Sequence, residues 1–157
     1  MSYLVMSESS NSLFSWIQAL EEEREILLCL LATTSAVRDS LKSGEDVSEL
    51  LEKRDAECKV LKQVFEKRHA ISSDLLPQLN DLSGGHFADR IRSLQDEITG
   101  LAEQLLVTQS ECETIMKSRL QILAGALKES AQRRLVESAY GPVWSGAERP
   151  VFIDRQQ

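Results

Sequence analysis

Apolar residues recur at helical spacing over the first third of the chain. From Leu13 onward they are separated by three or four residues, or by multiples near seven, which places them on one face of an α-helix. Ser10, Asn11 and Ser12 offer capping oxygens at the start, and Gly44 is the residue type expected just past the end. The pattern therefore predicts a helix over residues 11–43, with an apolar face made of Leu13, Ile17, Leu20, Leu27, Leu31 and Leu41.

A second amphipathic stretch follows directly. Asp46 and Glu49 have the spacing of a capping box, and Pro77 is expected to end the periodic pattern. The pattern predicts a helix over residues 47–76. Its apolar positions are Leu50, Leu51, Cys58, Leu61, Val64, Phe65, Ile71 and Leu75. Residues 77–86 include Pro77 and the pair Gly84-Gly85, so they are predicted to form a loop with at most one helical turn.

The third stretch has the most regular spacing in the chain. Alternating steps of three and four residues are typical of a coiled-coil seam, and they predict a helix over residues 87–137. The seam consists of Ile91, Leu94, Ile98, Leu101, Leu105, Thr108, Cys112, Ile115, Arg119, Ile122 and Ala126. A second stripe, Met116, Leu120, Leu123 and Leu127, runs beside its last part. With no strand-like alternation before residue 138, the predicted fold is all-α: an antiparallel three-helix bundle or coiled coil over residues 1–137.

The predicted helices differ in length. The first two contain about 30 residues each and the third about 50, so the third would outrun antiparallel neighbours by roughly 20 residues. Ile115, Met116 and Leu120 are expected in the core. For Ile122, Leu123, Ala126 and Leu127 the mismatch removes intramolecular partners, so a role in binding another protein and a place in the core both remain open.

Residues 138–157 differ from the rest of the chain. They contain two of the three prolines, together with Tyr140, Trp144, Phe152 and Ile153. Glycine and proline interrupt regular helix, so this segment is predicted to be an irregular, apolar C-terminal tail outside the bundle. Its aromatic side chains either fold back on the bundle or bind a partner.

Charge and composition narrow the function. The chain has a net charge of −7, which opposes binding to a phosphate backbone, so nucleic acid is not an expected partner. The N-terminus lacks the basic region and long apolar run of a secretory signal. The longest strongly apolar stretch, residues 26–32, is far shorter than the roughly 20 residues of a membrane-spanning helix. We expect a cytoplasmic protein with no membrane insertion.

No residue pattern indicates catalysis or a cofactor. The cysteines lie far apart within predicted helices and are interpreted as small apolar residues. His69 and His86 have no partner at a metal-binding spacing. The three consecutive acids Glu21 to Glu23 fan around a helix and are interpreted as a solvated face. The sequence therefore predicts a binding protein without catalytic, cofactor-binding or metal-binding residues.

Two segments resemble the FlgN family of flagellar export chaperones. Residues 41–68, LKSGEDVSELLEKRDAECKVLKQVFEKR, are similar to the family's linker with glycine and acid followed by a leucine pair and a further heptad. Residues 101–127 resemble its long closing helix, and AYGP at residues 139–142 places Tyr140-Gly141 where such chaperones often have Tyr-Gly. Paired asparagines, frequent in the family's long helix, are replaced here by Gln104, Thr108 and Gln109.

The resemblance implies a non-enzymatic chaperone. Such a protein binds helical terminal regions of hook-filament junction proteins (hook-associated proteins), prevents their premature assembly and presents them to components of the flagellar export apparatus. The residues expected to bind the client are Ile122, Leu123, Ala126, Leu127, Tyr140, Val143, Trp144, Phe152 and Ile153. The alternative is a coiled-coil scaffold that forms a homodimer through the seam of residues 91–126.

Overall fold

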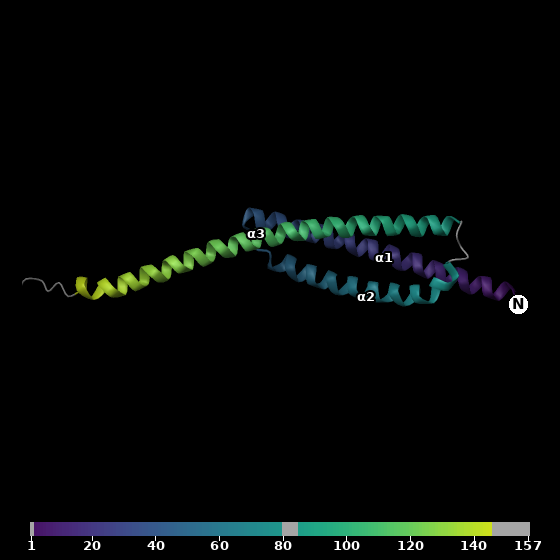
Figure 1. Cartoon of the computed structure of the whole chain (residues 1–157), viewed down its shortest axis with the longest axis horizontal. Helices are drawn as coiled ribbons and strands as arrows, with labels where there is room; N and C mark the ends of the chain where they lie inside the picture. Colours follow the sequence, from purple (N-terminus) through teal and green to yellow (C-terminus); the bar gives the residue numbers. More distant parts are fainter. Residues whose placement is uncertain (1, 80–84, 146–157) are drawn as a thin grey trace, which may run out of the picture. The chain divides into compact units, whose positions relative to one another are not determined.

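The computed structural model describes the backbone of residues 2–79 and 85–145 and the side chains of residues 11–73 and 85–140. These residues form three helices, α1 (Ser2–Ser43), α2 (Ser48–Leu79) and α3 (His86–Ser145), shown in chain order in Figure 1. No strand occurs among them. The all-α prediction, including the long third helix, is confirmed.

All three helices extend beyond the predicted ends. α1 begins at Ser2 rather than at residue 11, because no glycine or proline precedes Gly44 and the serines fit within the helix. Ser15, for example, donates its hydroxyl hydrogen to the carbonyl of Asn11. α2 continues past Pro77 to Leu79, three residues beyond its predicted end at residue 76.

α3 likewise ends at Ser145, not at residue 137. Residues 138–145 are therefore helical, and the prediction that the irregular tail begins at residue 138 is wrong for them. Gly141 and Pro142 lie within the helix, close to its end, where one missing backbone donor affects few hydrogen bonds. Residues 146–157 lie outside the described residues.

Gly44 follows the end of α1, as the sequence predicts. Gly44 has a φ of 84°, a left-handed conformation that glycine adopts without steric cost. Its N–H donates to the carbonyl of Ser40, and the N–H of Glu45 donates to the same oxygen. The Asp46 carboxylate accepts hydrogen bonds from the backbone N–H and hydroxyl of Ser48, which lower the pKa of Asp46.

α1 is the central helix of residues 1–115. It contributes buried side chains to two apolar clusters. The first contains Leu13, Trp16, Ile17, Leu20, Ile91 and Leu94, with Ile71 and Ile98 packed against it. The second contains Val37, Leu41 and Cys112, with Val47, Leu50 and Ile115 packed against it. Each cluster includes residues of α1 and α3, and α2 adds half-buried side chains.

Interhelical contacts establish the helix directions. Along α1, Glu22 pairs with Lys67 and Thr33 bonds to Glu57, so α2 runs antiparallel to α1. Arg24 pairs with Glu97 and Arg38 with Glu111, so α3 runs parallel to α1. The arrangement is an up-down-up bundle with short connections, as expected for neighbouring helices.

Candidate functional site

The pairing of α3 with α1 ends at a defined position. Arg24 with Glu97 and Arg38 with Glu111 are both pairs of residues 73 positions apart. At that offset the last core residue of α1, Leu41, corresponds to position 114 of α3. α1 ends at Ser43 and α2 begins at Ser48. α1 therefore has no residues left to pair with α3 beyond about residue 116.

The burial of α3 changes at the same position. Ile91, Leu94, Thr108 and Cys112 are buried, and Ile115 is half-buried. Every described side chain of residues 116–140 is exposed. The chain also divides into two compact units between Ile115 and Met116. We call residues 86–115 the packed half of α3 and residues 116–145 its C-terminal segment.

The C-terminal segment exposes large apolar side chains. Ile122 is 70%, Leu123 56% and Leu127 63% exposed, and Ala126 is exposed as well. Met116 and Leu120 are also exposed, so their predicted place in the core is wrong. The sequence repeats the same spacing in both halves of α3 and carries no direct sign of where the partners stop.

These side chains form two adjacent rows. Ile122 and Ala126 continue the seam of the packed half. Met116, Leu120, Leu123 and Leu127, the Met–Leu stripe, form a second row at steps of four, three and four residues. At 100° per residue, the two rows share one broad face of the helix.

The remaining predicted site residues lie further along the chain. Tyr140 is 63% exposed and lies in α3. It follows Ile122 by 18 residues, or five complete turns, which places both on the same side of the helix. Val143 and Trp144 also lie in α3, although only their backbone is described. Phe152 and Ile153 lie outside the described residues.

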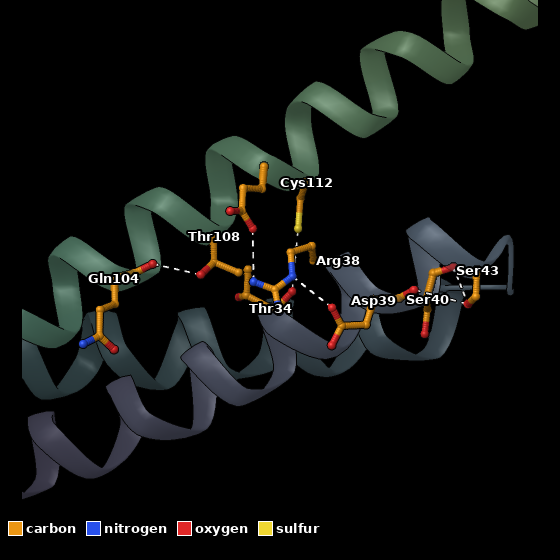
Figure 2. A network of polar contacts seen from close by, with 9 residues as sticks. Thr34, Arg38, Asp39, Ser40, Ser43, Gln104, Thr108 and Cys112 are labelled. Atoms are coloured by element: carbon orange, nitrogen blue, oxygen red, sulfur yellow. Dashed lines mark hydrogen bonds and ion pairs between the residues drawn. The ribbon is translucent and has the colours of Figure 1, made fainter.

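A polar network joins the helices near the end of the packed half (Figure 2). Arg38 of α1 forms ion pairs with Asp39 and, 3.1 Å away, with Glu111 of α3. The thiol of Cys112 lies 3.6 Å from the carbonyl oxygen of Thr34. Burial raises the pKa of Cys112, which keeps the thiol protonated near neutral pH.

Arg54 of α2 completes this polar layer. Its Nε donates to the Thr34 hydroxyl over 3.1 Å, and its terminal nitrogen donates to the Gln109 side chain. One guanidinium therefore links all three helices. Such partly buried polar contacts favour a single helix register, because any shift leaves a polar group without a partner. Spacing alone did not reveal them.

The three consecutive glutamates of α1 contact different helices. Glu21 pairs with Arg90 of α3, Glu22 with Lys67 of α2, and Glu23 with Arg68 of α2. Glu23 is only 5% exposed, so its interpretation as part of a solvated face is wrong. Desolvation raises the pKa of Glu23, and the nearby charge of Arg68 partly offsets that effect.

The described residues include no group of three or more His, Cys, Asp or Glu side chains arranged to hold a metal ion. The three cysteines are free thiols. Cys112 is buried as predicted, whereas Cys29 and Cys58 are exposed rather than packed. Within the same described ranges, no helix combines the length and apolarity needed to cross a bilayer.

Comparison with known proteins finds no matching family model, curated protein or solved structure. Any proposal for the function of this chain therefore depends on the exposed face of the C-terminal segment and on the sequence resemblance given above.

Proposed function

We propose that this protein is a cytoplasmic export chaperone for hook-filament junction proteins of the flagellum. The observation that carries the proposal is the run of exposed side chains over residues 116–140 of α3, several of them large and apolar. Contiguous exposed apolar surface of this kind is typical of a protein-binding site. The sequence resemblance supplies the class of client.

The proposed mechanism uses helix pairing and no covalent chemistry. An amphipathic helix from the terminal region of the client lies along Ile122, Leu123 and Leu127 and buries its own apolar face there. That face drives polymerisation in the assembled filament, so its burial prevents premature assembly. Residues from Tyr140 onward, including Val143 and Trp144, extend the contact or bind a component of the export apparatus.

A homodimeric scaffold is the second candidate. Ile122 and Ala126 continue the seam of the packed half, and two copies could pair along that row. A scaffold of this type sediments as a tight dimer without any client. A chaperone has a client-free state and forms a defined complex with its client.

The deciding experiment mixes the full chain with purified hook-filament junction proteins. It compares the wild type with the double variant Leu123→Glu and Leu127→Glu by sedimentation velocity and calorimetry. We expect the variant to lose binding while its melting temperature changes little, because exposed substitutions usually alter stability by less than about 0.5 kcal/mol.

The matched control is Leu106→Glu with Val107→Glu. These residues are 70% and 62% exposed and lie in the packed half of the same helix, so the control should bind the client normally. Equal loss of binding in both variants would refute a specific surface. Unfolding of the Leu123 and Leu127 variant would assign these leucines to the core.

A further inference from the structure

Charge is distributed unevenly between residues 1–115 and the exposed residues 116–140. Residues 1–115 contain 11 basic and 21 acidic residues, whereas residues 116–140 contain five basic and two acidic residues. The exposed segment thus has a net charge of +3 in a protein whose total is −7. Because this helix face is both apolar and basic, a partner that covers it should be apolar at the contact and acidic beside it.

The packed half shows how this helix selects its neighbours. Three positions immediately before seam residues carry charge: Arg90, Glu97 and Glu111. Each forms an ion pair with a residue of opposite charge on α1, namely Glu21, Arg24 and Arg38 respectively. Charges at these flanking positions determine which helix pairs alongside, as in coiled coils.

Continued at the same spacing, the Met–Leu stripe next reaches Ser130 and Arg134, and the positions that flank this row carry no acid. The residues that follow Met116, Leu123 and Ser130 are Lys117, Ala124 and Ala131. Those that precede Leu120, Leu127 and Arg134 are Arg119, Ala126 and Arg133. All are exposed. The alanines permit a close approach of a second helix, and the basic residues favour acidic partners.

From this pattern we infer that the Met–Leu stripe binds an amphipathic helix whose apolar face is flanked by Glu or Asp. The inference rests on the proposed function only in using the same surface. A second copy of the segment is disfavoured, because two helices of net charge +3 repel each other. A helix partner is favoured over a bilayer, because the Met–Leu stripe has the three-and-four spacing of a helix–helix seam and the small residues Ala124, Ala126 and Ala131 lie beside it.

The experiment uses two synthetic helical peptides of equal length. Both have leucine at the seam positions; one has glutamate and the other lysine at the flanking positions. Their binding to the full-length protein is measured by fluorescence anisotropy. We expect the acidic peptide to bind at least about tenfold more tightly than the basic one. That preference should shrink at about 0.5 M salt, where exposed charges are screened.

Charge reversal tests the named residues. The double variant Lys117→Glu and Arg133→Glu should reverse the peptide preference. The control Lys62→Glu with Arg92→Glu makes the same charge change on exposed residues outside the segment, and it should leave the preference unchanged. The Leu123→Glu and Leu127→Glu variant should bind neither peptide.

Three results would overturn the inference. The first is equal binding of both peptides. The second is a client-free dimer that the Leu123 and Leu127 substitutions dissociate. The third is tight binding to vesicles of anionic phospholipid with no peptide preference. The chaperone proposal is judged separately. Selective binding of the acidic peptide without binding of junction proteins supports the inference and rejects the chaperone function. Binding of junction proteins that charge reversal does not change supports the chaperone function and rejects the inference.

Discussion

The two halves of α3 share one sequence pattern but have different surroundings. In the packed half, Ile91 and Leu94 are buried against α1. In the C-terminal segment, Leu123 and Leu127 follow the same spacing and are exposed. The difference arises outside α3, because α1 ends at Ser43, which at the offset of 73 residues corresponds to position 116 of α3, and α2 begins at Ser48. Periodicity thus identifies a face that can be buried, and the neighbouring chain determines whether it is.

The comparison is tested most directly by one substitution made in each half. Leu94 is completely buried, so Leu94→Ala should lower the free energy of unfolding by about 2–5 kcal/mol. Leu123→Ala should change it by less than about 0.5 kcal/mol. Chemical denaturation of both variants measures the contrast. Similar losses for the two would show that the segment is covered in the free protein.

The sequence predicted the seam of the packed half because a buried helix face must be apolar at every turn. Ile91, Leu94, Thr108 and Cys112 are all buried as expected. Helix ends were less predictable, since Pro77 and Pro142 each remove one donor without stopping the helix. The burial of Glu23 could not be read from spacing either, because it depends on Arg68, 45 positions away in the chain.

The exposed face was predictable only through helix lengths. The exposure of Leu123 and Leu127 follows from comparing three helices, not from their own neighbours in the sequence. Met116 and Leu120 were misplaced for the same reason. A difference of a few residues in where α1 ends moves the boundary between core and surface along α3.

A second prediction concerns the turn that sets this boundary. Gly44 adopts a positive φ, and a side chain there clashes with the backbone in the left-handed conformation. Gly44→Ala should therefore cost about 1–2 kcal/mol. Thermal unfolding followed by circular dichroism measures the loss. An unchanged melting temperature with higher helix content would instead indicate that α1 continues past residue 44.

Glycine-to-alanine changes within α3 sharpen the comparison further. A Cβ at Gly100 or Gly125 meets no atom within 4 Å, so both substitutions should stabilise helix by about 0.5–1 kcal/mol. Gly100→Ala should raise the global melting temperature. Gly125→Ala should increase the ellipticity of the exposed segment without shifting the main transition, and an equal shift for both would show that α3 unfolds as one unit.

The smallest expected effect is a pH-dependent change in stability that is caused by Glu23. Because burial raises its folded pKa, the folded state binds this proton more tightly than the unfolded state. The stability contribution of Glu23 is therefore fully present below its ordinary pKa and is lost as pH rises through the raised value. Glu23→Gln cannot ionise, so its melting temperature should exceed that of the wild type near pH 8. The excess should shrink as pH falls toward about 4.5, near the ordinary pKa of glutamate.

The exposed Glu129 of the C-terminal segment provides the matched control for this measurement. Glu129→Gln should change the melting temperature little at both pH values, because substitutions of exposed residues usually alter stability by less than about 0.5 kcal/mol. A lower melting temperature for Glu23→Gln near pH 8 would show that the 2.7 Å ion pair with Arg68 outweighs the cost of burial. Residues 1–115 would then owe part of their stability to a buried charge, whereas the C-terminal segment, wholly exposed over its described side chains, offers no such site.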